Sequence, residues 1–66
     1  MSFLLPNQEL VTVERQELFD KMILLRVFLQ RTSFLTIDPY EQDRLKEQYG
    51  YMSSYLDVLD RRIAAF

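Results

Sequence analysis

Apolar residues in the second half of the chain recur at a spacing that leaves few possible folds. From Leu45 to Phe66 they alternate between steps of four and three residues, the heptad pattern of a helix that packs along one continuous seam. This predicted seam consists of Leu45, Tyr49, Met52, Leu56, Leu59, Ile63 and Phe66. Because one helix cannot bury such a seam alone, the pattern predicts a second helix that covers it.

The segment from Asp38 to Glu41 marks the start of this helix. Asp38 is a favourable N-cap, Pro39 suits the first helical position, and Glu41 is the acidic residue expected three positions after the cap. We therefore predict a helix over residues 39–66. Gly50 lies within it, and we expect a bend or a close helix contact there rather than a break.

The first half of the chain predicts an earlier helix over residues 7–30, with Asn7 as its N-cap. Its apolar stripe consists of Val11, Leu18, Met22, Leu25 and Leu29, and Arg15 takes the position that would complete the spacing. Residues 31–38 lack helical periodicity and are expected to be a connector whose apolar members close the hairpin end. Residues 1–6 are an N-terminal arm. The prediction is one all-α domain over residues 1–66, an antiparallel two-helix hairpin.

Composition limits how so small a chain can be stabilised. A chain of 66 residues buries only about 60% of its unfolded surface, so it usually needs disulfides, a metal or oligomerisation. Cysteine and histidine are both absent, which excludes disulfides and the usual thiolate or imidazole metal sites. We therefore expect a homo-oligomer, most simply a dimeric four-helix bundle with coiled-coil packing.

One surface of the first predicted helix suits such a contact. Apolar side chains between Met22 and Leu29 point in nearly every direction, and a single partner helix cannot cover them. The predicted oligomer interface consists of Phe19, Ile23, Leu24, Val27 and Phe28.

The charge pattern excludes several function classes. Ten acidic and eight basic residues give a formal net charge of −2 without a basic block, so we expect no general nucleic-acid binding. No apolar run approaches the length of a membrane span or of a signal-peptide core, and we expect a cytoplasmic protein. The carboxylate pairs on the helices lack a histidine or a cleft, so we expect no enzyme activity, no catalytic residue, no metal and no cofactor.

Four residues of the second predicted helix are candidates for binding a ligand. They are Arg44, Tyr51, Tyr55 and Arg62. In a symmetric oligomer an arginine can meet its symmetry mate and form an anion pocket, and the two tyrosines, four residues apart, could stack on a base. The alternative is that the arginines are solvated charges and the tyrosines cover a partner helix.

A set of residues spread over nearly the whole chain after residue 7 forms a distinctive pattern. Its most distinctive part is the ending Arg62-Ile63-Ala64-Ala65-Phe66. The other positions are Glu14–Lys21, Leu25, Phe28, Leu29, Phe34, Glu41, Gln42, Leu45, Gln48, Met52, Tyr55, Val58 and Leu59. With these residues the sequence resembles a group of very small helical proteins of tailed phages and prophages. The resemblance implies a phage origin and a helical shape rather than an activity.

Three functions remain open. The first is an accessory protein that acts by binding a host factor or by counter-defence, in the cytoplasm of the host cell. The second is an oligomer that sequesters a small anionic or nucleotide ligand between subunits, as some small phage proteins do. The third is a structural component of the phage particle.

Overall fold

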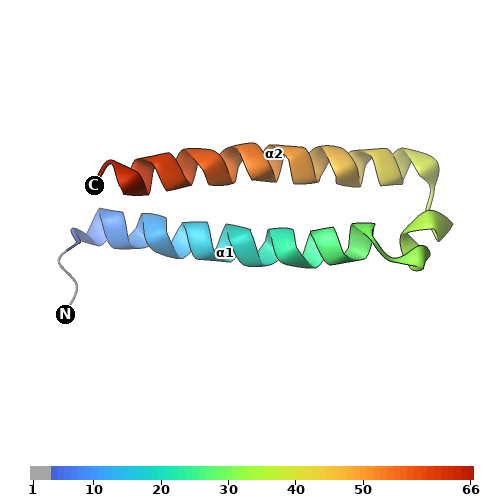
Figure 1. Cartoon of the computed structure of the whole chain (residues 1–66), viewed down its shortest axis with the longest axis horizontal. Helices are drawn as coiled ribbons and strands as arrows, with labels where there is room; N and C mark the ends of the chain where they lie inside the picture. Colours follow the sequence, from blue (N-terminus) through green and yellow to red (C-terminus); the bar gives the residue numbers. More distant parts are fainter. Residues whose placement is uncertain (1–3) are drawn as a thin grey trace.

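Two long antiparallel helices joined by a short 3-10 helix make up the protein (Figure 1). The computed structural model describes residues 4–66. Helix α1 spans Pro6–Leu29, η1 spans Thr32–Thr36 and α2 spans Pro39–Ala64. The helices lie side by side, so the described chain starts and ends at the same end of a rod of 48 × 19 × 13 Å. The predicted all-α hairpin is confirmed, and no strand occurs in the described residues.

Helix α1 begins one residue earlier than predicted. Pro6 takes the first helical position, Leu5 is the N-cap, and the Gln8 side chain accepts a hydrogen bond of 2.9 Å from the Leu5 backbone N–H. The predicted N-cap at Asn7 is therefore wrong, because a proline that needs no N–H partner can itself open the helix. Residues 1–3 of the predicted arm lie outside the described residues.

Helix α2 begins as its capping sequence predicts. The Asp38 carboxylate accepts a hydrogen bond of 3.2 Å from the Glu41 backbone N–H, and Pro39 follows the cap. The Glu41 carboxylate pairs with Arg44 instead, at 3.1 Å. The helix ends at Ala64, two residues before the predicted end.

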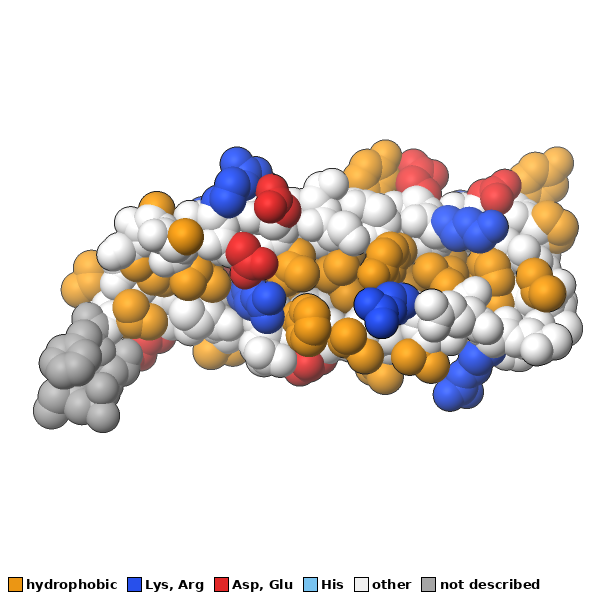
Figure 2. Space-filling view, viewed as in Figure 1, with side chains coloured by type: hydrophobic (Ala, Val, Ile, Leu, Met, Phe, Trp, Pro, Cys, Tyr) orange, Lys and Arg blue, Asp and Glu red, His pale blue; other side chains and the backbone are white. Residues whose placement is uncertain are grey.

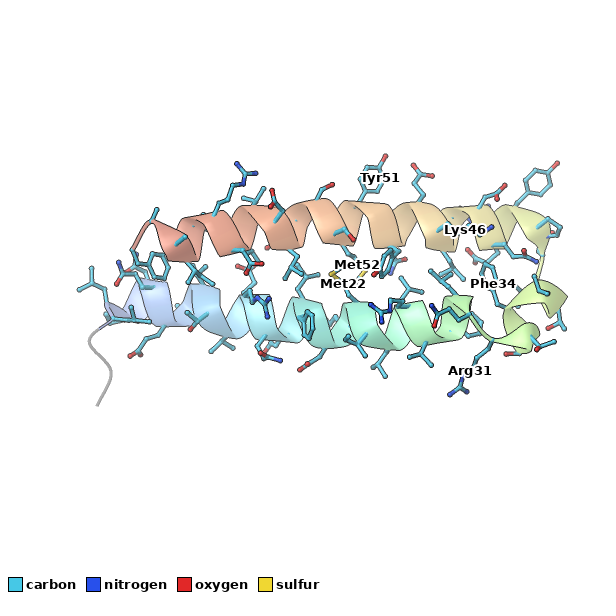
Figure 3. The ribbon with its side chains drawn as sticks, in the orientation of Figure 1. Met22, Arg31, Phe34, Lys46, Tyr51 and Met52 are labelled. Carbon is cyan, nitrogen blue, oxygen red and sulfur yellow. The ribbon has the colours of Figure 1, made fainter. Side chains whose placement is uncertain are left out.

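The core is a single row of side chains between the helices. Val11, Met22 and Leu59 are its buried members, and Leu59 is fully buried. Met22 and Met52 point toward each other across the seam (Figure 3), and apolar side chains follow the line between the helices in Figure 2. The other members of both stripes are half-buried, except Phe66, which is exposed. The predicted seam is thus confirmed up to Ile63.

The connector closes one end of the hairpin with an aromatic plug. Phe34 of η1 is buried and meets the Phe28 ring edge-on, with centroids 5.8 Å apart. The Lys46 ammonium lies 5.7 Å from the Phe34 ring centroid, a distance at which cation–π attraction acts. Phe34 confirms the predicted closure of the hairpin end, whereas the neighbouring Leu35 is exposed.

Arg15 fills the break in the α1 stripe with an ion pair across the hairpin. Its Nε lies 2.8 Å from Oδ1 of Asp60 on α2, and its guanidinium lies 4.9 Å from the Phe19 ring centroid. The hydrogen bond to Asp60 raises the pKa of Arg15 above its ordinary value. Because both side chains are partly exposed, this ion pair contributes little to stability.

Gly50 does not interrupt α2, and no neighbouring segment lies close to it. The helix is continuous through this residue, and a Cβ atom built on it would meet no atom within 4 Å. The expectation that Gly50 causes no break is confirmed, whereas the close helix contact, one of the two alternatives expected there, is wrong. Glycine at this position leaves the helix without a side chain and gains no contact in return.

Gly50→Ala should therefore stabilise the protein. Alanine lowers the backbone entropy of the unfolded chain and favours the helix, so the free energy of unfolding should rise by about 0.5–1 kcal/mol. Urea unfolding followed by circular dichroism measures the change. A loss of stability would show that the added methyl group meets a neighbour.

Candidate functional site

The described part of the chain has an open groove along one flank of α2. Its volume is about 340 Å³. The lining residues all come from α2 and are Arg44, Glu47, Gln48, Tyr51, Met52 and Tyr55. Tyr51 points away from α1 (Figure 3), so the groove opens to solvent on the outside of the hairpin.

Helical periodicity brings the groove residues together. Arg44, Gln48, Tyr51 and Tyr55 follow one another at steps of four, three and four, which places them on one helix face. Met52 is half-buried and belongs both to the groove lining and to the seam, so the groove adjoins the core through this residue. Three of the four predicted ligand-binding residues therefore share one surface.

The fourth predicted residue, Arg62, does not line the groove. Its charge nevertheless acts on the Tyr55 hydroxyl, where it opposes the rise in pKa that Glu14 causes. Arg62 follows Tyr55 by seven residues, about two helical turns, and so lies on the same side of α2 beyond the groove.

Carboxylates hold both tyrosine hydroxyls. Tyr51 donates a hydrogen bond of 3.0 Å to Glu47, and Tyr55 donates to Glu14 of α1. The hydrogen bond to Glu47 raises the pKa of Tyr51, and the hydrogen bond to Glu14 raises the pKa of Tyr55. Both phenols thus stay protonated at neutral pH, and each hydroxyl has a carboxylate partner.

The charges that line the groove are balanced. Arg44 contributes one positive charge and Glu47 one negative charge. Glu41, next to the groove, also lies 3.1 Å from Arg44. One chain alone therefore offers an apolar, aromatic surface with an arginine at its edge, but no excess of positive charge.

Sequence reasoning missed the remaining lining residues. Glu47 could have been found from its i,i+4 spacing to Tyr51, which allows the hydrogen bond observed. Gln48 carried no such signal, and Met52 was assigned to the seam alone. In residues 4–66, no group of three acidic residues is placed to hold a metal ion. Neither α1 nor α2 contains a stretch that could span a membrane.

The predicted oligomer interface lies on α1 and is only partly free. Ile23, Leu24 and Val27 are 39%, 73% and 42% exposed, whereas Phe19 and Phe28 are half-buried by contacts within the hairpin. We call the exposed three residues the outer stripe of α1.

Comparison with known proteins identifies the family. The sequence matches the Sequestin family over residues 5–65. The chain belongs to this family. It is also 38% identical over 63 residues to an Enterobacteria phage T4 protein, described as an uncharacterized 7.5 kDa protein in the denB-rIIB intergenic region, and the match covers 96% of this chain and 98% of that protein. No solved structure matches the chain. The predicted resemblance to small helical phage proteins is confirmed.

Glu47→Gln should lower the pKa of Tyr51 toward its ordinary value of 10.0, because the negative hydrogen-bond acceptor is lost. A pH titration of the ring carbons by NMR reports each tyrosine separately. Glu41→Gln is the matched control, since Glu41 pairs with Arg44 and not with the phenol. An unchanged Tyr51 titration in Glu47→Gln would contradict the hydrogen bond.

Proposed function

We propose that this Sequestin family member is a binding protein that sequesters a small anionic ligand carrying an aromatic ring, with nucleotides as the leading class. The observation that carries the proposal is the groove of α2, where Tyr51 and Tyr55 lie one helical turn apart and Arg44 lies at the edge. The family name denotes sequestering and names no ligand.

The groove has the chemistry that a nucleotide needs. A base can stack on a tyrosine ring, and such stacking contributes about 1–3 kcal/mol per base. Arg44 can bind a phosphate through its planar guanidinium. Glu47 and Glu14 hold the tyrosine hydroxyls, which lowers the entropy lost when a ligand is bound.

Binding without turnover is part of the proposal. Activation of a tyrosine as a nucleophile is favoured by a lowered pKa. The carboxylates at Tyr51 and Tyr55 instead raise the pKa of each phenol. The chain contains no histidine or cysteine to supply another nucleophile or base.

The phage relative supports a role in an infected cell. We propose that the protein works in the cytoplasm of the host as an accessory factor, and that removal of a nucleotide signal serves counter-defence. Two other functions were expected from the sequence: an accessory protein that binds a host protein, and a structural component of the phage particle. Neither function would require the groove.

Self-association is the second part of the proposal. In residues 4–66, the buried apolar side chains are Val11, Met22, Phe34 and Leu59, a small core for an independent domain. The outer stripe of α1 remains exposed and adds apolar surface that a second copy of the chain would cover.

Nucleotide binding should raise the melting temperature of the protein, because a ligand that binds only the folded state stabilises it. Differential scanning fluorimetry with a panel of linear and cyclic nucleotides tests this, and native mass spectrometry of the protein purified from phage-infected cells tests for a ligand already bound. A melting temperature unaffected by the whole panel, together with an unliganded mass, would contradict the proposal.

Tyr51→Ala should weaken binding of an active nucleotide by about 5-fold to 150-fold, the equivalent of one lost stacking contact of about 1–3 kcal/mol. Isothermal titration calorimetry measures the dissociation constant. Tyr40→Ala is the matched control, because Tyr40 is an exposed tyrosine on the same helix and does not line the groove. Equal losses in the two variants would remove the groove as the site.

Ile23→Lys or Val27→Lys should dissociate the oligomer, since each would place a charge in the apolar contact. Size-exclusion chromatography with light scattering gives the mass of the assembly. Gln16→Lys, also on the exposed surface of α1, should leave the mass unchanged. A folded wild-type monomer at micromolar concentration would contradict self-association.

A further inference from the structure

The thioether of Met52 lies at the boundary between the core and solvent. Met52 is half-buried, belongs to the seam and also lines the open groove of α2. Its side chain and that of Met22 point toward each other across the seam (Figure 3), and Met22 is only 7% exposed. One methionine of this facing pair is therefore open to small molecules from the groove, whereas the other is covered.

A hydrogen-bond donor already lies beside the sulfur of Met52. Nε2 of Gln48, one helical turn earlier, lies 3.9 Å from Sδ of Met52 and donates a weak hydrogen bond to it. Gln48 is exposed and lines the same groove. An oxygen atom bound to this sulfur on the groove side would be a much better acceptor for the same N–H group.

We propose that Met52 is a site of reversible oxidation to methionine sulfoxide by peroxides, and that this modification destabilises the seam between the helices. The inference goes beyond the proposed function and does not depend on it. It requires the position of one sulfur atom and no bound ligand.

The chemical step transfers one oxygen atom. A lone pair of the Met52 sulfur attacks one oxygen of hydrogen peroxide, and the O–O bond breaks. The proton of the attacked oxygen passes to the other oxygen, which leaves as water. The thioether is thus oxidised to the sulfoxide, and the peroxide is reduced. Methionine sulfoxide reductases reverse the change with two electrons from thiols, and the oxygen then leaves as water.

The product does not suit the seam. Oxidation converts a flexible apolar side chain into a polar, chiral one, and a polar group in a core costs free energy unless it is hydrogen-bonded. Among residues 4–66, the buried members of the seam are Val11, Met22 and Leu59. With so few buried side chains, a polar group opposite Met22 affects a large share of the core. Gln48 can bind the new oxygen only on the groove side.

The position of the sulfur also predicts the stereochemistry of the product. The seam lies on one side of the Met52 side chain and the groove on the other. Peroxide therefore reaches the sulfur from the groove, where Gln48 can bind the added oxygen. One of the two sulfoxide epimers should dominate in the folded protein.

Peroxide treatment of the full chain, followed by trypsin digestion and mass spectrometry, tests the site. Trypsin cleaves after lysine and arginine and so places each of the three methionines in a different peptide. Met52 should gain one oxygen several-fold faster than Met22, because a covered side chain reacts only when the helices separate locally. Equal rates at Met22 and Met52, or a faster reaction at Met22, would contradict the proposal.

Met52→Leu and Met22→Leu form a matched pair of variants, because leucine replaces methionine with little change in volume. After peroxide treatment, the melting temperatures of the wild type and of Met22→Leu should fall by about 4–8 °C, the shift expected when one polar group enters the core of so small a domain. Met52→Leu should keep its melting temperature. An equal fall in Met52→Leu, or no fall in wild-type protein fully oxidised at Met52, would show that this sulfur does not control the seam.

Enzymatic repair tests both reversibility and stereochemistry, since each of two methionine sulfoxide reductases acts on one epimer. Together they should restore the melting temperature of the oxidised protein. Applied to the tryptic peptide of Met52, one enzyme should repair nearly all of the material oxidised in the folded protein, whereas each should repair about half of the material oxidised in urea. Equal repair by both enzymes after oxidation of the folded protein would rule out access from the groove alone. A melting temperature that stays low after complete repair would rule out reversibility.

Discussion

A pair of helices has only one interface, and this constraint determines which side chains of the protein are buried and which are exposed. The seam between α1 and α2 contains the helices' buried residues Val11, Met22 and Leu59. In the described residues, the other faces of both helices are turned mainly to solvent, apart from the contact with Phe34 at the connector. The exposed apolar residues on both helices follow from this geometry, because a two-helix hairpin has no third element to cover them.

The candidate site depends on the same seam. Met52 contributes to the seam with one side and to the groove with the other, and the hydrogen bond from Tyr55 to Glu14 connects the groove to α1. The groove is therefore held in place by both helices although its lining comes from α2 alone. A substitution in the seam near Met52 would alter the groove without touching its exposed residues.

Residue spacing was enough to predict the seam, the hairpin and the start of α2, because heptad periodicity and the Asp38 cap are local signals. The start of α1 was missed since both Pro6 and Asn7 are favourable near a helix N-terminus, and only the backbone shows which position each takes. The unbroken helix at Gly50 was predicted, but the close contact offered as one alternative there was wrong, because a missing side chain can mean either a close contact or empty space.

The site was predicted in part. Arg44, Tyr51 and Tyr55 were chosen for their chemistry, and helical spacing explains why they meet. The ion pair between Arg15 and Asp60 could not be predicted as a specific contact, since its partners are 45 residues apart and their meeting depends on the register of the two helices. The spacing of the apolar stripes fixes a face but not a register.

The position of the aromatic plug also has a consequence for how the chain folds. Phe28 and Phe34 are close in sequence and meet at the connector, whereas the partners Arg15 and Asp60 are 45 residues apart in the chain. To form the second contact directly would cost about 2 kcal/mol more loop-closure entropy than the first. Loop-closure entropy therefore favours association of the helices from the connector outward, because each turn of contact shortens the loop that the next contact must close.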